Sequence, residues 1–568
     1  MRILTIDDTL TASAQLEVED VAVLHEQGVS ILVCNRPDNE AEGQVNVSEI
    51  SAAAAALGMS VVSMPFRSGQ QTEAQIEDFY RIFSGAESAG KKVHAYCRTG
   101  NRSICLWAAA SVKNGADVKA VTDKANALGV DVAEAIAPFT ATPSQAKGGG
   151  VQGRAASAAY DVVIVGAGSG GIAVAESIRK RDASLRLALI DPSEVHYYQP
   201  GWTMVGGGVF KRENTKRRMV DLIPRNVSWV KQAVTAFSPV DNAVHLDNGQ
   251  SVVYKQLIVC PGLELNWDGV KGLRETLGKN GVTSNYAYDL APYTWELVQG
   301  LEKGKAIFTQ PPMPIKCAGA PQKALYLSAD HWLKSGVLKN IDIDFCNAGA
   351  VLFGVAAYVP ALQEYIDKYN ANVHYKHTLV EIDGEQHKAY FKVDGQEELV
   401  CKEFDMIHVC PPQKSPSFIA ESELADASGW LDVDQFSLRH KKFDNVWGLG
   451  DVMNTPNAKT MAAVRKQVPV VAANIVSTLR QQELKDGYDG YGSCPLTVER
   501  GKIVLAEFGY GGKLLPSFPR FLLNGLVATR RAWWLKKSLL PFVYWHAMLK
   551  GREWLAGSKD LESLRKDS

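Results

Sequence analysis

The sequence predicts an α/β protein with two folded parts joined by a Gly-rich linker. Strand-like apolar runs alternate with runs of helical apolar spacing along the chain. A Gly-rich turn follows one such strand at 166–171, a pattern typical of nucleotide-binding α/β domains. The stretch 141–159 is small and Gly-rich, with no apolar residue bulky enough to anchor a core, as expected of a flexible linker. We therefore predict one domain over 1–140, two dinucleotide-binding domains over 160–510 and a tail over 511–568.

Composition narrows the class of protein. With 46% hydrophobic and 22% charged residues the chain is globular, and a formal net charge of -1 gives no reason to expect a nucleic-acid partner. The nine cysteines include no CxxC pair, so we predict neither a metal site nor a disulfide framework. The N-terminus lacks signal-peptide features, and no run approaches the ~20 apolar residues of a membrane-spanning helix. We therefore expect a cytoplasmic location with reduced thiols.

The N-terminal 140 residues alternate strand and helix patterns. Strand patterns cover 29–34, 60–64 and 92–96, and helix patterns cover 72–84 and 104–112. A Gly-containing loop lies between the last strand and the last helix. In that position backbone N–H groups converge on the centre of the loop, so the sequence predicts an anion cradle.

Cys97 begins this loop, in the sequence CRTGNRS. A helix N-terminus with adjacent arginines lowers a thiol pKa from ~8.5 to about 4–7, so we predict a thiolate. Arg98 and Arg102 carry planar guanidinium groups that suit an oxyanion or a persulfide. The predicted catalytic residues of this domain are therefore Cys97, Arg98 and Arg102.

Through this motif the first 140 residues resemble the phosphatase-like domain that other proteins carry fused to a persulfide dioxygenase. Tyrosine phosphatases place five residues between the Cys and the Arg, whereas four separate Cys97 from Arg102. The shorter loop is similar to that of rhodaneses, which implies a sulfane sulfur carried on Cys97. We expect a sulfurtransferase; a cysteine phosphatase is the alternative, with Asp38 as its candidate general acid.

A dinucleotide-binding signature opens the second part. The strand pattern 161–165 runs into GAGSGG, a helix pattern follows, and a second strand pattern over 185–190 ends in Asp191. The glycines allow a tight turn, close approach of a pyrophosphate and close helix packing, and the acid binds a ribose hydroxyl. The predicted cofactor-binding residues here are Gly166, Gly168, Ser169, Gly170, Gly171 and Asp191.

Far downstream, VWGLGD at 446–451 precedes a helix pattern that begins near Lys459. This segment resembles the second FAD signature of flavoproteins with two dinucleotide-binding domains, which implies FAD as the cofactor. In that family the Asp bonds the ribityl chain and the helix N-terminus points at the flavin. We therefore add Gly450, Asp451 and Lys459 to the cofactor site.

A second GxGxxG motif, which a pyridine-nucleotide reductase of this class needs, is missing. The equivalent strand pattern over 305–309 runs into QPPMP at 310–314. Prolines have no N–H to offer a pyrophosphate and cannot make the required turn. We therefore do not expect NAD(P)H to be a substrate.

Four motifs together closely resemble sulfide:quinone oxidoreductases of the mitochondrial-like type. The resemblance covers about residues 160–556. It implies that sulfide reduces FAD beside a redox cysteine and that a membrane quinone reoxidises the flavin. The motifs are VHYYQPGW at 195–202, PIKCAGAPQK at 314–323, VWGLGD at 446–451 and YGSCPL at 491–496.

Cys317 falls on the first redox cysteine of that family, with Lys316 and Lys323 close by in sequence. The second redox cysteine of the family directly follows the Gly-x-Gly-Asp segment, and here that position is Val452. Valine cannot form a disulfide, so either another thiol replaces it or this half does something other than ordinary sulfide oxidation. Our candidate for the replacement is Cys410, which follows a strand pattern and completes the predicted catalytic set.

The region 520–552 contains seven Lys or Arg residues interleaved with aromatic residues, and no Asp or Glu. It is too interrupted to span a bilayer but suits an interfacial element on anionic lipid. We predict a peripheral protein on the inner face of the membrane, and we expect FAD to stay bound when 520–568 is removed. The alternative is a basic helix packed on the protein itself or at a dimer contact.

Together these patterns predict a fused sulfur-handling enzyme. In this interpretation Cys317 receives sulfane sulfur from sulfide, electrons pass through FAD to quinone, and the Cys97 domain transfers the sulfur to a small thiol such as glutathione. The alternatives are a type 2 NADH:quinone oxidoreductase-like enzyme, which the prolines at 311–314 disfavour, and a redox-sensing flavoprotein.

Overall fold

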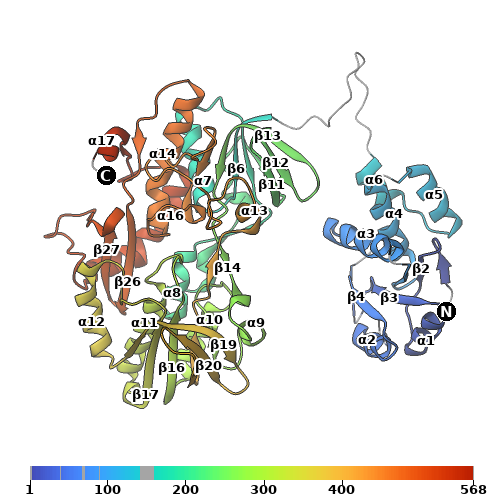
Figure 1. Ribbon diagram of the computed structural model, residues 1–568, viewed down its shortest axis with the longest axis horizontal. Coiled ribbons are helices and arrows are strands. Elements are labelled where there is room, and N and C mark those ends of the chain that lie inside the picture. The colour runs from blue at the N-terminus through green and yellow to red at the C-terminus, as the bar shows by residue number, and fades with distance from the viewer. Residues whose placement is uncertain are drawn as a thin grey trace. The chain divides into compact units, whose positions relative to one another are not determined.

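The computed structural model divides the chain into two compact units, Met1–Gln152 and Gly153–Ser568 (Figure 1). Of the predicted linker 141–159, only Ala159 lies among the described residues, where it begins a strand. The described residues are 3–38, 40–41, 43–66, 71–88, 90–114, 116–140 and 159–566.

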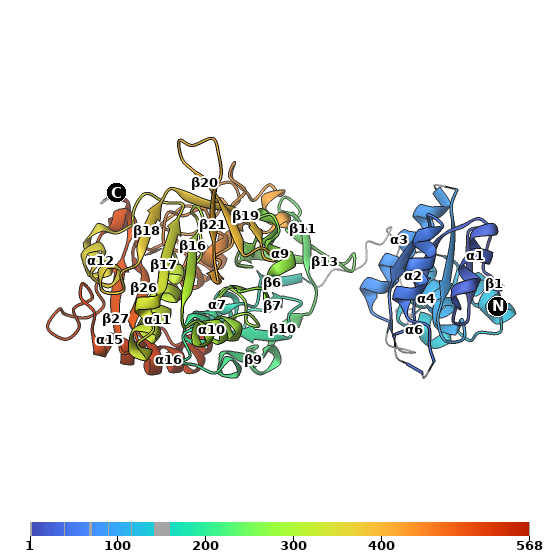
Figure 2. The same ribbon diagram turned by 90° about the horizontal axis from the view of Figure 1, so that it is seen from below.

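The first unit is a five-stranded sheet with helices on both faces (Figure 2). The strand order is β1-β2-β5-β3-β4, and all pairs are parallel except β1 with β2. The predicted strands 29–34 and 92–96 are confirmed with the same bounds. The strands are β1 Ile3–Thr5, β2 Leu10–Ser13, β3 Val29–Cys34, β4 Ser60–Ser63 and β5 Lys92–Tyr96.

Alternation along the strands divides the core of this unit between the two sheet faces. Leu32 joins an apolar cluster with residues of α1 and α2, whereas its neighbour Val33 joins a cluster with residues of α3 to α6. Successive side chains of a strand point to opposite faces, so each β3 residue serves one layer. The helices are α1 Val18–Glu26, α2 Val47–Ala56, α3 Glu73–Ser88, α4 Asn101–Lys113, α5 Val118–Ala127 and α6 Ala133–Thr140.

The second unit contains two sheets built around parallel strands, as predicted for two dinucleotide-binding domains; in the first sheet, β11 and β12 extend the parallel part by antiparallel pairing. In the first sheet, the strands β10, β7, β6, β13 and β24 are parallel neighbours, so their carboxyl ends share one edge. The helices α7 Ser169–Arg181 and α14 Met461–Leu479 pack together with this sheet in one apolar core. The strands are β6 Ala159–Val165, β7 Leu187–Ile190, β10 Val227–Val230, β11 Val234–Ser238, β12 Ala243–Leu246, β13 Ser251–Val259 and β24 Val446–Gly448.

The second sheet has the order β15-β22-β16-β17-β18 and is parallel throughout. After β16 the chain passes through the proline-containing segment and enters α11 only at Ala320, ten residues beyond the end of the strand at Gln310. This sheet therefore lacks the short glycine turn of the first. The elements are β15 Val282–Thr283, β16 Gly304–Gln310, β17 Ile341–Asn347, β18 Asn372–Tyr375, β22 Met406–His408, α10 Ala291–Gly300, α11 Ala320–Ser335 and α12 Val359–Lys368.

Smaller elements connect and cover the two sheets. A three-stranded antiparallel sheet of β19 His377–Asp383, β20 Lys388–Val393 and β21 Val400–Glu403 flanks the second sheet. The other short elements are β8 Val195–Tyr197, β9 Lys216–Arg218, β14 Glu264–Leu265, β23 Gln413–Lys414, β25 Asp486–Gly487, β28 Lys559–Asp560, α8 Trp202–Gly206, α9 Leu273–Thr276, α13 Ser417–Ala420 and α17 Leu561–Lys566.

The C-terminal region is built into the second unit. The hairpin of β26 Gly492–Glu499 and β27 Lys502–Phe508 is followed by α15 Arg530–Trp534, a π-helical turn over Leu535–Leu539 and α16 Leu540–His546. Tyr544, Trp545, Met548 and Leu549 are buried in the core of the first sheet. The predicted tail 511–568 is thus largely packed against the flavoprotein-like domains. Within the described ranges, no helix has the length and apolar character needed to cross a membrane.

Candidate active site

The glycines of the loop after β6 have two different roles: some allow the turn to form, and one leaves space for a ligand. Gly166 has φ +100°, and a Cβ on it would lie 2.6 Å from the carbonyl oxygen of Cys260. A Cβ on Gly171 would lie 1.9 Å from the Gly166 carbonyl oxygen. A Cβ on Gly168, by contrast, would have no protein atom within 4 Å, and Gly168 lines a cavity. Gly166 and Gly171 are therefore required by the turn and by its packing, whereas Gly168 leaves room for a ligand.

Asp191, at the end of β7, is anchored to this loop. One carboxylate oxygen accepts the Ala167 N–H at 2.6 Å, and the other accepts the Ser193 N–H at 2.8 Å. Burial raises the pKa of Asp191 above its usual range. Each oxygen keeps a second lone pair, and the residue lines the same cavity, so it is positioned to accept a ligand hydroxyl.

The second predicted motif reaches the cavity from β24, which pairs with β13. Gly450 and Asp451 both line the cavity, and burial raises the pKa of the Asp451 carboxyl. Lys459 donates to the carbonyl oxygens of Asp451 at 2.6 Å and Met453 at 2.7 Å, and burial lowers its pKa to about 8. Lys459 therefore holds the turn in place. Gly170 brings α7 against this motif, since a Cβ there would lie 3.0 Å from Leu449.

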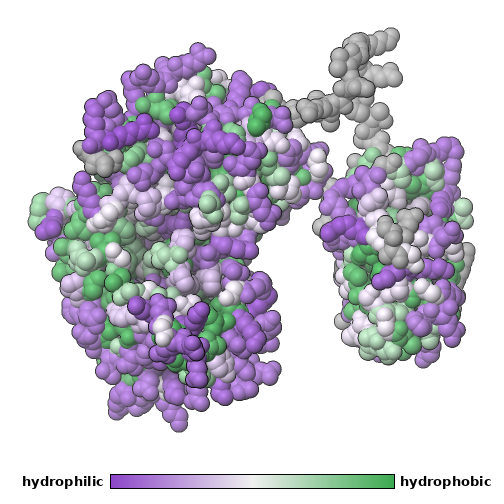
Figure 3. Space-filling view, in the orientation of Figure 1, coloured by the Kyte–Doolittle hydropathy of each residue, from purple (hydrophilic) through white to green (hydrophobic). Residues whose placement is uncertain are grey.

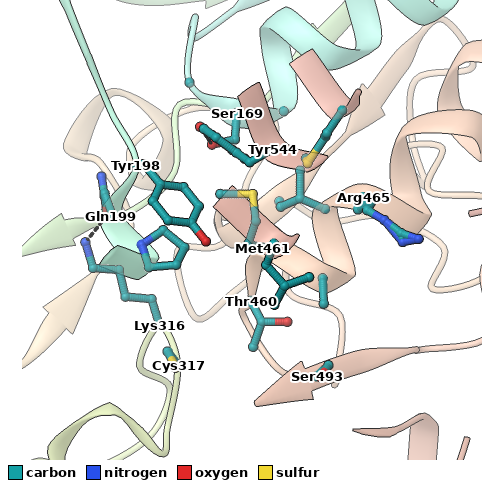
Figure 4. Close-up of a pocket in the computed structure, with 18 of the residues that line it drawn as sticks. Ser169, Tyr198, Gln199, Lys316, Cys317, Thr460, Met461, Arg465, Ser493 and Tyr544 are labelled. Atoms are coloured by element: carbon teal, nitrogen blue, oxygen red, sulfur yellow. Dashed lines mark hydrogen bonds between the residues drawn. The ribbon is translucent and has the colours of Figure 1, made fainter. Parts of the chain in front are cut away.

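A single cavity of about 500 Å³ connects the two motifs with the thiol predicted from sequence (Figure 4). Cys317 lines it together with Ser169 at the start of α7. Lys316 donates to the side-chain oxygen of Gln199 at 2.6 Å, shown as a dashed line in Figure 4. The volume lies within the range of about 300–1,000 Å³ usual for ligand sites.

Cys317 stands in a constrained turn just before α11. Its φ is +53°, and its N–H donates to the carbonyl oxygen of Lys459 at 2.8 Å. Its sulfur lies 2.9 Å from Nζ of the buried Lys323 and 3.6 Å from the sulfur of Cys494. Cys494 belongs to β26, so the hairpin supplies a second thiol to the site.

The surroundings of Cys317 favour its thiolate. The Cys494 thiol donates to the Cys317 sulfur, and together with the ammonium groups of Lys323 and Lys536 it lowers the pKa of Cys317 well below the usual value. The same hydrogen bond and burial raise the pKa of Cys494. Lys536 is itself buried, which lowers its pKa to about 7. The hydrogen bond therefore favours a proton on Cys494 and a thiolate on Cys317.

The C-terminal region closes the cavity. Lys536 comes from the π-helical turn, and its Nζ donates to the carbonyl oxygen of Pro495 at 3.3 Å. The hydroxyl of Tyr544, from α16, lies 2.6 Å from the Ser169 hydroxyl and 2.5 Å from Nε2 of His196. The sequence favoured a membrane surface for this region, with packing on the protein itself as the alternative. Its part in the cavity was not predicted, because the basic and aromatic pattern does not reveal which residues turn inward.

The loop at Cys97 lies in the first unit. Cys97 is buried, and its sulfur accepts the N–H of Gly100 at 3.1 Å; Gly100 has φ +93° and caps α4. Arg102 donates to both oxygens of Glu40, at 2.6 and 2.7 Å, and to the Phe66 carbonyl oxygen at 2.9 Å.

The predicted anion donors of this loop are therefore arranged differently from the expectation. The hydrogen bond from Arg102 lowers the pKa of the Glu40 carboxyl. The Arg98 side chain is exposed. In the part of the chain that the structure describes, neither arginine makes a hydrogen bond to the Cys97 sulfur. Asp38, the candidate acid, accepts the Val47 N–H at 2.9 Å at the start of α2.

Two family models match the chain. The phosphatase-like domain of beta-lactamase hydrolase-like protein matches residues 1–114, and pyridine nucleotide-disulphide oxidoreductase matches residues 160–294. These matches agree with the two predicted classes of domain.

Sulfide:quinone oxidoreductases of several organisms match the second unit over most of its length. The mitochondrial sulfide:quinone oxidoreductase of Dictyostelium discoideum is 43% identical over 394 residues, which cover 69% of this chain and 86% of the relative. The mitochondrial sulfide:quinone oxidoreductase of Mus musculus is 37% identical over 393 residues, which cover 69% of this chain and 87% of the relative. The chain belongs to the sulfide:quinone oxidoreductase family. It is accordingly a flavin-dependent oxidoreductase.

The fold agrees with this assignment. The sulfide:quinone oxidoreductase of Aquifex aeolicus superposes with a TM-score of 0.58 at 18% identity, over 70% of this chain and 92% of that structure. Within the described ranges, no group of His, Cys, Asp and Glu side chains could hold a metal ion.

Val452, the position where the resemblance implies the family's second redox cysteine, is fully buried in the core of the first sheet. Cys410, our predicted substitute, follows β22, where burial raises its pKa to about 12 and its sulfur contacts the carbonyl oxygen of Pro411 at 3.8 Å. Cys317 packs against the apolar cluster that contains Cys410, and a sulfur–sulfur distance of 3.6 Å joins it to Cys494. Cys494 was visible in the sequence as the cysteine of the YGSCPL motif. The sequence does not show, however, that the strand β26, which carries this cysteine, passes Cys317.

Proposed function

We propose that the second unit is an FAD-dependent enzyme that oxidises sulfide and transfers the electrons to a membrane quinone. The observation that carries this proposal is the position of Cys317. Its sulfur lines the same cavity as the glycine loop and lies 2.9 Å from the Lys323 ammonium group. In this proposal a nucleotide cofactor bound at the glycine loop and the reactive sulfur of Cys317 therefore share one cavity.

The residues of the cavity fit FAD. The open face of Gly168 and the N-terminus of α7 suit a pyrophosphate, Asp191 suits a ribose hydroxyl, and Asp451 suits the ribityl chain. Asn285 supports a polar ligand, because both polar atoms of its side chain are buried without a partner among the described residues while it lines the cavity. When bound, FAD supplies the two-electron acceptor that connects sulfide with quinone.

The side chains of the protein prepare sulfide for attack and hold the product. Lys323 and Lys536 give the site a positive potential that attracts the hydrosulfide anion. The Cys317 thiolate is held by the Lys323 ammonium group at 2.9 Å and can carry a sulfane sulfur as a persulfide. Because Lys536 has a pKa of about 7, it can give or take a proton at neutral pH.

The test is stopped-flow reduction of the bound flavin by anaerobic sulfide, in wild type and in Cys317→Ala. We expect the wild-type flavin to bleach and the variant to react at least ~100-fold more slowly, since the nucleophile is lost. A colourless protein, or equal rates in the two proteins, would overturn the proposal. Bleaching by NADH but not by sulfide would favour the NADH:quinone oxidoreductase alternative.

For the first unit, we propose a sulfurtransferase that accepts sulfane sulfur on Cys97 and passes it to a small thiol such as glutathione. Supporting this, the Cys97 sulfur accepts the backbone N–H of Gly100, a donor that stabilises a thiolate or persulfide anion. One terminal nitrogen of Arg102 donates to Glu40 and the other donates to the Phe66 carbonyl oxygen, so both are already engaged and a cysteine phosphatase is less well supported.

We further propose that the C-terminal region binds the inner face of the membrane. Although much of it packs inward, Trp534 and Phe542 are 60% and 61% exposed and Phe521 is 88% exposed. Figure 3 shows hydrophobic residues gathered on the surface around β26 and β27. Exposed aromatic side chains beside lysines and arginines suit the headgroup layer of an anionic membrane, where a quinone is available.

A further inference from the structure

The sulfur of Cys317 has a neighbour that neither the family pattern nor the sequence motifs assigned to it. Val452 occupies the position of the family's second redox cysteine and offers no thiol. The sulfur of Cys494 lies 3.6 Å from that of Cys317. We propose that Cys494 is the second redox sulfur of this enzyme and forms a reversible disulfide with Cys317 during turnover. The proposal rests on the proposed oxidation of sulfide.

The backbone is built to let these two sulfurs meet. Cys494 lies on β26, and the loop that carries Cys317 runs past this strand at Gly319, where a Cβ would lie 2.7 Å from the Cys494 sulfur. Only a glycine at 319 permits this approach without displacing Cys494. A disulfide bond is about 2.05 Å long, so the sulfurs must move about 1.5 Å closer, which a small rotation of the two side chains can supply.

The two sulfurs are not equivalent, and this gives the reaction a direction. Cys317 lines the cavity, whereas Cys494 is only 2% exposed and lies behind it. The ammonium group of Lys323, which lies 2.9 Å from the Cys317 sulfur, lines the same cavity, whereas Cys494 does not line it. Hydrosulfide therefore reaches the Cys317 sulfur of the disulfide, and Cys494 is the leaving group.

In the opening step, hydrosulfide attacks the Cys317 sulfur of the disulfide. A new sulfur–sulfur bond forms on Cys317, and the bond between the two cysteines breaks. The bonding electron pair stays on Cys494. The products are a Cys317 persulfide and a Cys494 thiolate, which takes up the proton released by the persulfide or by Lys536. This exchange is balanced without any external oxidant.

In the closing steps, a small thiolate attacks the outer sulfur of the persulfide and forms a new sulfur–sulfur bond with it. The bond between this outer sulfur and the Cys317 sulfur breaks, and Cys317 becomes a thiolate again. Oxidation of the Cys317 thiolate and the Cys494 thiol then re-forms the disulfide and releases two electrons and one proton. The quinone oxidant of the proposed activity takes these electrons. One sulfide thus gives one sulfane sulfur and two electrons in each cycle.

The experiment is peptide mapping by mass spectrometry of the full-length enzyme. Free thiols are alkylated in acid after oxidation with a short-chain quinone, and the protein is then digested without reductant. We expect a crosslinked pair of peptides containing Cys317 and Cys494, with or without one inserted sulfur atom. The crosslink should be lost in Cys494→Ser and in Cys494→Ala, and should persist in the control Cys401→Ser, whose thiol is exposed on β21.

Turnover with sulfide and quinone separates failure of this inference from failure of the proposed function. We expect both Cys494 variants to retain bound flavin but to lose at least ~10-fold in turnover. A wild-type enzyme that turns over while both thiols stay free, or one whose crosslink joins Cys317 to Cys410, would overturn the role of Cys494 alone. A wild-type enzyme with bound flavin and no sulfide-dependent turnover would overturn the proposed function. The wild-type map does not depend on the folding of any variant.

Discussion

At the residue scale, the chemistry of the second unit depends on a few positions with unusual local demands. Gly166 and Gly171 are required because any side chain would collide with backbone, whereas Gly168 faces open space. Cys317 adopts a left-handed conformation and lies within reach of a buried ammonium group. Residues of the same type therefore have separable roles, and substitutions can distinguish them.

We expect alanine substitutions at Gly171 and Gly168 to affect different properties, the first the stability of the fold and the second the binding of FAD. We expect Gly171→Ala to lower the free energy of unfolding of the flavin-free unit by about 1–3 kcal/mol or more, because its Cβ would lie 1.9 Å from the Gly166 carbonyl oxygen. Gly168→Ala should leave that stability within ~0.5 kcal/mol and instead weaken FAD binding. Denaturant unfolding and flavin titration measure the two effects. Equal destabilisation by both substitutions would contradict this division of roles.

The reactivity of Cys317 should depend little on pH near neutrality. Its lowered pKa keeps the thiolate populated below the pKa of an ordinary thiol, which loses thiolate ~10-fold per pH unit as pH falls. We expect alkylation of Cys317 by iodoacetamide to change less than about threefold between pH 8 and pH 6. In Lys323→Met the pKa should rise and the rate at pH 6 should fall. A steep wild-type profile, followed by mass spectrometry of the Cys317 peptide, would exclude the thiolate.

At the scale of elements, the C-terminal region has two faces with different roles. Lys536 and Tyr544 point into the cavity, whereas Trp534 and Phe542 are exposed. Removal of 520–568 would take away the Tyr544 hydroxyl that contacts Ser169 at 2.6 Å in the glycine loop. The structure therefore leads us to expect loss of FAD on truncation, in place of the retention expected from the sequence.

Point substitutions on the outer face test the membrane proposal without opening the cavity. We expect Trp534→Asp combined with Phe542→Asp to retain flavin but to reduce sedimentation with anionic vesicles at least ~10-fold, because buried aromatic area is lost and negative charge is introduced. The control is Val240→Asp, at a 78% exposed position between β11 and β12. Unchanged sedimentation of the double variant would place the membrane contact elsewhere.

At the scale of the whole molecule, the two units have separate cores. Apolar clusters of the first unit contain no residue of the second, and the matched families are different for the two. Two independent cores predict two independent folding units.

Each unit, produced as a separate fragment, should therefore fold and keep its own activity. We expect residues 153–568 to bind flavin and reduce quinone with sulfide within about twofold of the full chain. We expect residues 1–140 to transfer sulfur from thiosulfate to a thiol, and Cys97→Ser to abolish this transfer without changing flavin reduction. Hydrolysis of an aryl phosphate without sulfur transfer would instead identify the first unit as a phosphatase. Loss of flavin from the longer fragment would show that the units depend on each other.

Local pattern was enough to predict much of the fold. The strands at 29–34 and 92–96 were predicted to the residue, since both are short runs rich in strand-forming residues. The helix expected from about Lys459 begins at Met461. These elements depend on the order of neighbouring residues, which a sequence contains completely.

The sequence alone determined which chemical groups are available: a glycine loop, two acids at strand ends, Cys317 with its lysines, and a valine where a thiol was expected. Only the tertiary structure decided which of them meet. It brought Cys494 to Cys317 across 177 positions of chain and turned Lys536 and Tyr544 into the cavity. Contacts of this kind arise from the packing of a hairpin and a late helix against distant sheets, and no spacing along the chain encodes that packing directly.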